Sequence, residues 1–318
     1  MLLCFPASQS ERESKASCSG DRASAHREYP PMSNAASPIR GALRPGASWM
    51  LIAPLLLLLA FAFFWPIVNL LSRSLFVPEF SLQNYQRLFN EPLYWRIFGR
   101  TFWISACCCL LSLMLGYPVA YAMARLKGWR LAFVAACVLI PLWTSVLVRS
   151  YAWVFLLQRN GVVNAMLNDL GLIGAPLRLL YTEGAVLAAM THVLLPFMIL
   201  PIFATLRGIP PELERAARNL GAGRAQAFMR VTLPLSLPGV STGVLFVFIL
   251  ALGFYITPAM VGGPQTLMIG TLIAQQVTDL LDWEFAGAVS AVLMVLTMGA
   301  VITFQRALSV ERLAGNAD

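Results

Sequence analysis

Charged residues are scarce in this chain of 318 amino acids. Asp, Glu, Lys and Arg make up 12% of it and hydrophobic residues 58%, whereas soluble domains carry about 25% charged residues. Only two lysines are present, Lys15 and Lys127, and neither completes the phosphate-binding pattern Gly-x-x-x-x-Gly-Lys-Ser/Thr. The sequence therefore excludes a nucleotide site of this type, and energy from ATP would have to come from another polypeptide.

Residues suited to catalysis or metal binding are also few. The only histidines are His26, near the N-terminus, and His192, inside an apolar run. We expect His192 to make a hydrogen bond between helices rather than to bind a substrate. The six cysteines follow no metal-ligand spacing, and we interpret those within apolar runs as small apolar fillers. We expect no cofactor, no metal and no enzymatic activity, because no nucleophile is paired with a base.

Six apolar runs are long enough to cross a bilayer, which takes about 20 residues. They cover approximately residues 49–71, 102–124, 131–157, 185–206, 240–262 and 287–308, and none contains Asp or Glu. We predict an all-α integral membrane protein with a six-span domain over 49–310, a disordered N-terminal segment 1–48 and a short C-terminal segment 311–318. An ion-coupled secondary transporter or channel remains the alternative, although such proteins usually carry ionisable groups in their spans.

The net charge of +8 is interpreted as a topology signal rather than as a sign of nucleic-acid binding. Sixteen of the 23 Lys and Arg residues fall in the N-terminal segment, the second and fourth connections and the C-terminal end. Basic residues accumulate in short cytoplasmic loops, so we predict that both termini are cytoplasmic. The external segments are then 74–97, 158–184 and 263–286. In the second of these, the apolar spacing predicts a short helix.

One polar stretch, residues 212–234, separates the fourth and fifth runs. Leu213, Ala216, Ala217 and Leu220 follow the spacing i, i+3, i+4, i+7, which predicts one small apolar helix face. Gly221 ends this helix, as glycine does at a left-handed cap. A second short amphipathic run follows and is expected to end at Leu233-Pro234. The pattern predicts a helix–glycine–helix block at the membrane surface that docks into the groove of a partner.

This block resembles the cytoplasmic coupling loop of permease subunits from binding-protein-dependent ATP-driven importers. The family pattern is Glu-Ala-Ala, three residues, Gly, nine residues, an aliphatic residue, any residue and Leu-Pro. Here Arg215 stands at the glutamate position, one residue after Glu214. The candidate ATPase-coupling residues are Leu213, Glu214, Arg215, Ala216, Ala217, Leu220, Gly221, Phe228, Val231, Leu233 and Pro234.

Further segments, 141–153, 160–161, 180–183 and 195–201, resemble the polyamine (spermidine/putrescine) and opine subgroup of these permeases. The resemblance covers most of residues 50–308. It implies the type I importer permease fold in the bacterial inner membrane and transport of a polyamine, opine or related small organic solute by alternating access. The implied partners are a cytoplasmic ATPase dimer, a second permease subunit that we expect to differ from this one, and a periplasmic solute-binding protein.

Two segments are candidates for the translocation path. Arg149 lies near the outer end of the third run, where a charge is costly and often functional; alternatively it reaches the headgroups or pairs structurally. In the fifth run, Phe254 stands where many polyamine-type relatives carry an acidic residue, and the missing carboxylate weakens the case for a polycationic solute. The candidates are Arg149, Tyr151, Trp153, Phe254, Tyr255, Thr257 and Pro258. The Gly262-Gly263-Pro264 cluster is either an exit turn or a substrate contact.

Overall fold

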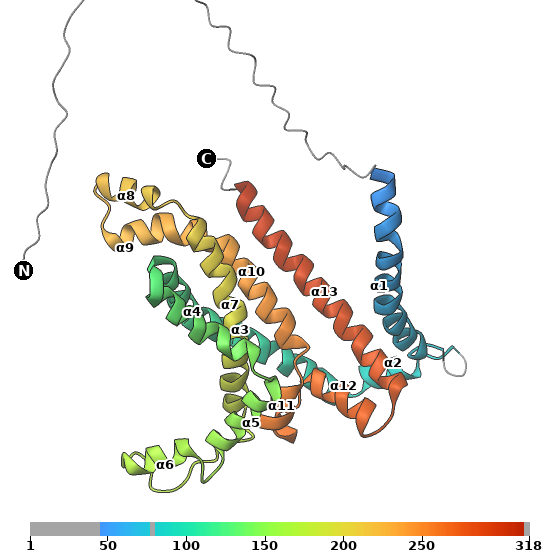
Figure 1. Ribbon diagram of the computed structural model, residues 1–318. Helices are drawn as coiled ribbons and strands as arrows, with labels where there is room; N and C mark the ends of the chain where they lie inside the picture. The colour runs from blue at the N-terminus through green and yellow to red at the C-terminus, as the bar shows by residue number, and fades with distance from the viewer. Residues whose placement is uncertain (1–44, 77–79, 315–318) are drawn as a thin grey trace, which may run out of the picture. The chain divides into compact units, whose positions relative to one another are not determined.

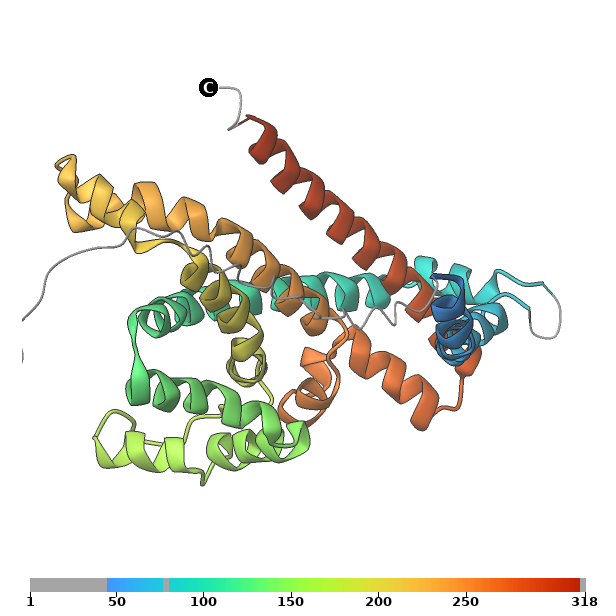
Figure 2. The same ribbon diagram turned by 45° about the horizontal axis from the view of Figure 1, so that its top comes forward.

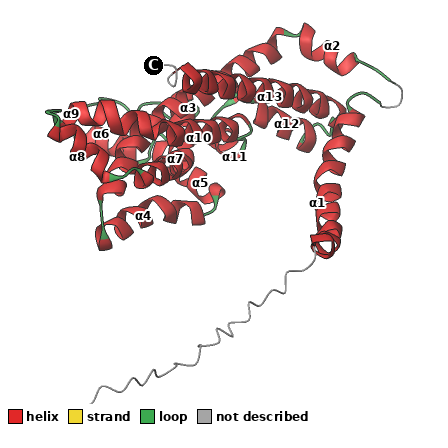
Figure 3. Cartoon of the chain, turned by 90° about the horizontal axis from the view of Figure 1, so that it is seen from above, coloured by secondary structure: helices red, strands yellow, loops and turns green. Residues whose placement is uncertain are grey.

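The computed structural model describes residues 45–76 and 80–314. Apart from an isolated bridge between Phe76 and Phe80, the regular elements of these residues are helices (Figures 1 and 3). The predicted all-α fold is confirmed. The elements are α1 (Pro45–Arg73), α2 (Gln83–Asn90), α3 (Pro92–Arg125), α4 (Gly128–Trp143), α5 (Val146–Leu157), α6 (Val162–Asp169), α7 (Glu183–Gly208), α8 (Pro211–Asn219), α9 (Arg224–Ala227), π-helix η1 (Phe228–Thr232), α10 (Leu233–Leu252), α11 (Ile256–Val261), 3-10 helix η2 (Pro264–Thr266), α12 (Ile269–Thr278) and α13 (Trp283–Ala314).

The chain divides into two units, residues 1–57 and 58–318. Of the first unit only residues 45–57 are described, as the beginning of α1. The predicted disordered segment 1–48 therefore lies mostly outside the described residues, and its last four residues are helical. At the other end, α13 runs to Ala314, past the predicted end of the membrane domain at residue 310.

Within residues 45–76 and 80–314, five helices are long and apolar enough to span a membrane, and a sixth span would be a broken helix pair. The five are Ala53–Arg73, Pro92–Arg125, Glu183–Gly208, Arg224–Leu252 and Trp283–Arg306. The third predicted run, 131–157, does not form one continuous helix. The chain bends by 99° at the break between α4 and the helical segment that begins at Val146. At this break the Thr144 hydroxyl donates to the Pro141 carbonyl at 2.8 Å. A side chain that takes over a helix carbonyl in this way competes with the next backbone N–H.

The fifth predicted run, 240–262, is also interrupted. The helix α10 ends at Leu252, and α11 begins only at Ile256. The start of α12 passes close to this break, since a Cβ added at Gly270 would lie 3.0 Å from the carbonyl oxygen of Phe254. The segments expected to be external contain more helix than predicted: α2 and the start of α3 in the first, and α12 in the third. The short helix expected in the second is α6.

The core of the second unit forms where α3, α7 and α10 pack together, as Figure 2 shows for α7 and α10. Gly239 and Gly243 are one turn apart on α10, and both face α7. An added Cβ would lie 2.8 Å from the carbonyl oxygen of Pro201 at Gly239, and 2.8 Å from the sulfur of Met198 at Gly243. Small residues at this spacing let membrane helices approach closely, which fixes α7 against α10.

Candidate functional site

The polar block forms the predicted helix, glycine and second helix. After α8, the N–H of Gly221 donates to the carbonyl of Arg218 at 3.0 Å, and the N–H of Ala222 donates to Ala217 at 3.1 Å. Gly221 has a φ of +91°, the left-handed conformation that glycine adopts without a Cβ penalty. Figure 1 shows α8 and α9 beyond one end of α7 and α10, with α6 and α11 toward the other end.

The predicted end of the block at Leu233-Pro234 is wrong. The second helix continues from α9 through η1 directly into α10, so residues 224–252 form one span. Pro234 has no N–H to donate, and it is accommodated at the beginning of α10, directly after the wider turns of η1. The polar block therefore continues without interruption into an apolar helix that is long enough to span a membrane.

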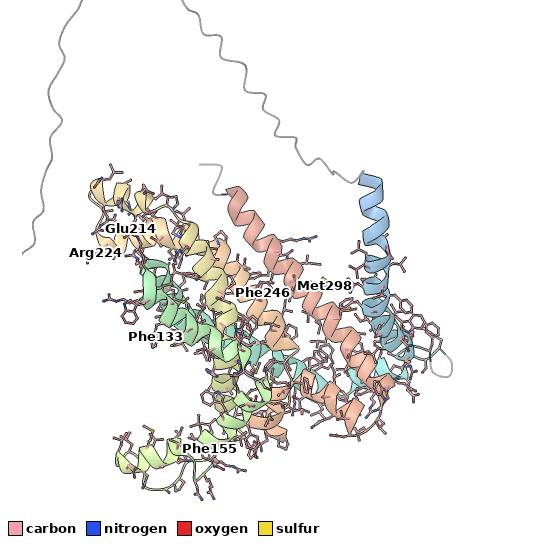
Figure 4. The ribbon with its side chains drawn as sticks, viewed as in Figure 1. Phe133, Phe155, Glu214, Arg224, Phe246 and Met298 are labelled. Atoms are coloured by element: carbon pink, nitrogen blue, oxygen red, sulfur yellow. The ribbon has the colours of Figure 1, made fainter. Side chains whose placement is uncertain are left out.

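Glu214 forms an ion pair within the chain. Its carboxylate accepts a hydrogen bond from the Arg125 guanidinium at 2.7 Å, which joins α8 to the end of α3. The guanidinium lies 4.3 Å from the ring centroid of Tyr121, and Tyr121 in turn packs edge-on against Phe228 with centroids 5.3 Å apart. Figure 4 shows Glu214 on α8 near Arg224 of α9. The sequence singled out Glu214 but not its partner on α3.

The remaining candidates of the block divide between outward and inward positions. Leu220 is 90% exposed and Leu213 is 43% exposed, so the apolar face of α8 is largely uncovered in this chain. Arg215 is also exposed. The later candidates contribute more to the interior: Phe228, Val231 and Leu233 are half-buried, whereas Pro234 is exposed. Ala216 is exposed and Ala217 half-buried.

The candidate path residues are brought together by α5, α7 and α11. The hydroxyls of Ser150 and Thr257 are 2.8 Å apart in a buried contact between α5 and α11. The Trp153 indole N–H donates to Nδ1 of His192 on α7 at 3.3 Å, which confirms the predicted hydrogen bond between helices. Ser150 was missed by sequence reasoning, because a lone serine in an apolar run carries no distinguishing pattern.

The other path candidates lie differently. Pro258 is buried, and Phe254 packs partly buried against the core. Tyr151 and Tyr255 are 67% and 49% exposed. The glycine cluster forms a tight turn: the Gly263 N–H donates to Oγ1 of Thr266 at 2.7 Å.

Arg149 is the least satisfied of these groups. Its Nε and Nη1 atoms are buried without a hydrogen-bond partner among the residues that the structure describes. Guanidinium groups in such positions normally form ion pairs or charged hydrogen bonds. The site therefore has polar groups on three helices and includes a guanidinium group with two nitrogens that are unpaired among the described residues.

Comparison with known proteins gives a family and several relatives. The family described as "Binding-protein-dependent transport system inner membrane component" matches residues 112–315. The spermidine/putrescine transport system permease protein PotB of Haemophilus influenzae is 34% identical over 266 residues, covering 82% of this chain and 90% of PotB. The inner membrane ABC transporter permease protein YdcU of Escherichia coli is 36% identical over 231 residues, covering 69% of this chain and 73% of YdcU.

A solved structure shares the fold. It is a bacterial alginate ABC transporter in complex with an alginate pentasaccharide-bound periplasmic protein, with a TM-score of 0.66 and 20% identity, covering 81% of this chain and 93% of the matched chain. The family match includes α5, α7, α8 and α11, and hence both groups of candidate residues.

Proposed function

Because the chain belongs to the family of binding-protein-dependent transport system inner membrane components, we propose that α8 is the element through which a separate ATPase drives it. The chain is a transmembrane permease subunit of an ATP-driven importer and contributes to the translocation path. ATP is hydrolysed on a cytoplasmic ATPase dimer, and a periplasmic binding protein delivers the solute. The second permease subunit is a different chain.

The observation that carries this proposal is the uncovered apolar face of α8 at Leu213 and Leu220. An amphipathic helix with an open apolar face is suited to a hydrophobic groove of a partner. The ion pair of Glu214 with Arg125 and the continuous helix 224–252 connect this helix to α3 and α10. A displacement of α8 by the ATPase would therefore move the core helices as a group, as alternating access requires.

The solute is a polyamine, an opine or a related small organic molecule. The support is the likeness to PotB, named for spermidine and putrescine. None of the six apolar runs supplies a carboxylate to hold an ammonium group. This chain would instead offer aromatic faces, those of Trp153 and Tyr255, which attract cations through their quadrupoles.

The test is the variant Gly221→Val, compared with Gly223→Val. Both glycines are exposed and have nothing within 4 Å of an added Cβ, but only Gly221 has a positive φ. A left-handed conformation costs an ordinary residue about 1–2 kcal/mol, and a β-branched side chain is disfavoured further. We expect Gly221→Val to insert normally but to lose about tenfold in retention of the ATPase, since ~1.4 kcal/mol corresponds to tenfold in affinity.

Retention is measured by co-purification, and coupling by solute-stimulated ATP hydrolysis in reconstituted vesicles. Gly223→Val should behave like the wild type in both measurements. Wild-type retention and stimulation in Gly221→Val would mean that the block is only a connecting loop. Autonomous transport by the purified chain, with no ATPase attached, would instead favour the ion-coupled alternative.

The orientation proposed for the chain is N- and C-termini in the cytoplasm, with Gly221 cytoplasmic and Asp169 periplasmic. The support is the distribution of Lys and Arg over short loops and the position of α8 and α6 toward opposite ends of α7 (Figure 1). Single cysteines at residues 221 and 169, in a background without the native six, are treated with an impermeant thiol reagent in intact cells. Labelling at 169 alone is expected, and labelling at 221 alone would reverse the topology.

A further inference from the structure

A cavity of about 340 Å³ lies where α5 ends and α7 begins, toward the end of α7 that is remote from α8 (Figure 1). One wall consists of Leu157, the last residue of α5, with Gln158 and Arg159, which follow it. The other consists of residues 178–181, shortly before α7 begins at Glu183. The cavity thus lies between the end of α5 and the segment that leads into α7.

Asn164, a side chain of α6 that is only 3% exposed, holds the two walls together. Its amide donates to the carbonyl of Gln158 at 3.3 Å and to the carbonyl of Leu177 at 3.0 Å, and its oxygen accepts from the N–H of Leu177 at 2.9 Å. Gly161 permits the tight turn between the walls, since a Cβ there would lie 2.5 Å from the carbonyl oxygen of Leu156. The cavity is therefore preformed.

The charges of the cavity are of one sign. Arg159 on one wall and Arg178 on the other are both exposed, and neither forms an ion pair with an acidic residue in the described part of the chain. Two guanidinium groups that line one cavity repel each other unless an anion lies between them. The planar guanidinium donates two parallel hydrogen bonds to a carboxylate, which makes a carboxylate a well-matched ligand.

The cavity is connected to the candidate path. Tyr181 lines it and has a φ of 65°, an uncommon conformation for a residue other than glycine. The N–H of Tyr181 donates to the carbonyl of Val261, the last residue of α11, at 3.1 Å. The same helix carries Thr257, whose hydroxyl meets that of Ser150 on α5. A ligand that shifts Tyr181 would act directly on the end of α11.

We propose that this cavity receives an acidic side chain of the periplasmic solute-binding protein, held between Arg159 and Arg178. The proposal rests on the proposed function, which places this face of the chain on the periplasmic side. A protein carboxylate fits better than a lipid phosphate because both arginines lie in the segments that follow α5 and precede α7, and Gln158 lines the same cavity. Docking would then be sensed by α11 through Tyr181.

The test uses the complete transporter in lipid nanodiscs with the solute-binding protein encoded beside the permease gene. The double variant Arg159→Glu/Arg178→Glu is compared with Arg96→Glu, which reverses an exposed arginine at the start of α3 that does not line the cavity. We expect the double variant to bind the binding protein at least about tenfold more weakly, because like charges across an interface repel. Basal ATP hydrolysis and ATPase retention should stay at wild-type values.

A milder double variant, Arg159→Gln/Arg178→Gln, guards against misfolding caused by two new carboxylates, and it should weaken binding in the same direction. Raising the salt concentration should weaken binding to the wild type more than to the Gln variant, because the ion pairs are screened. Wild-type affinity in both double variants would overturn the proposal and would leave a lipid phosphate as the occupant. Failure of the binding protein to stimulate even the wild-type transporter would instead overturn the proposed function.

Discussion

The helices α7 and α4 are both apolar enough to enter a membrane, but they are used differently. In the most apolar 18-residue stretch of α7, 56% of the residues are buried inside the chain, whereas α4 has no buried residue. Trp143 at the end of α4 is 90% exposed, and Trp129 near its start is 75% exposed. Figure 4 labels two further exposed aromatic residues, Phe133 of α4 and Phe155 of the neighbouring helix α5.

The difference lies in the neighbours rather than in hydrophobicity. Gly116 of α3 and Gly243 of α10 both lie against α7: an added Cβ would lie 3.3 Å from Met198 at Gly116, a tight contact, and 2.8 Å from its sulfur at Gly243, which is too close. The segment α4–α5 carries large aromatic residues outward and breaks at Thr144-Ser145. Close packing in lipid depends on small residues, because apolar surface alone gains nothing from leaving lipid tails. The contrast indicates a close-packed core of α3, α7 and α10, with the exposed aromatic sides of α4 and α5 available to lipid or to a partner chain.

The largest effect is expected from a substitution that disrupts the packing of α10 against α7 in the core. In Gly243→Leu the new Cβ would lie 2.8 Å from the sulfur and 3.1 Å from the carbonyl oxygen of Met198. The sulfur can move but the backbone cannot, so α10 would have to separate from α7. Overpacking of this kind costs about 1–3 kcal/mol or more, and we expect most of the folded protein to be lost, as measured by monodisperse yield and thermal stability in detergent.

The matched control is Gly299→Leu on α13, where nothing lies within 4 Å of an added Cβ. It should retain nearly wild-type yield, because the leucine adds apolar surface in an open position. If the two variants lost yield equally, the loss would reflect the leucine itself and not the contact with α7. The distinction between a close-packed core and an outer segment would then have no energetic basis.

Much of this fold could be predicted from the sequence, because a run of about 20 apolar residues without acidic groups leaves few alternatives to a membrane helix. The breaks could not. Pro141 lies inside α4 without ending it, and Pro196 and Pro201 lie inside α7, which stays continuous. The actual break depends on the hydroxyl of Thr144 and, after α10, on the approach of Gly270 to Phe254. The contact of Gly270 with Phe254 joins separate segments, and such contacts are not visible in local periodicity.

The helix–glycine–helix geometry of residues 211–227 could also be predicted from local spacing. The positive φ of Gly221 follows from its position after the periodic residues of α8. The pairing of Glu214 with Arg125 joins residues 89 positions apart, and no spacing rule connects them. The local geometry of the block could therefore be predicted from the sequence, whereas its attachment to α3 could be seen only in the structure.

A smaller effect is expected at α5, where a substitution can test whether this helix serves transport or folding. Arg149 is partly exposed, with two guanidinium nitrogens that are buried and have no hydrogen-bond partner among the described residues. If the outer segment serves transport rather than folding, Arg149→Ala should lower solute uptake more than it lowers the yield of the complex. A charged hydrogen bond contributes about 1.5–3 kcal/mol, so we expect uptake to fall by about tenfold or more.

Arg130→Ala, which removes an exposed arginine from α4, serves as the control and should leave both uptake and complex yield unchanged. Uptake in vesicles and complex yield are measured on the same preparations. Equal losses of uptake and yield in Arg149→Ala would assign this arginine to the structure of the chain, and α5 would then belong with the core.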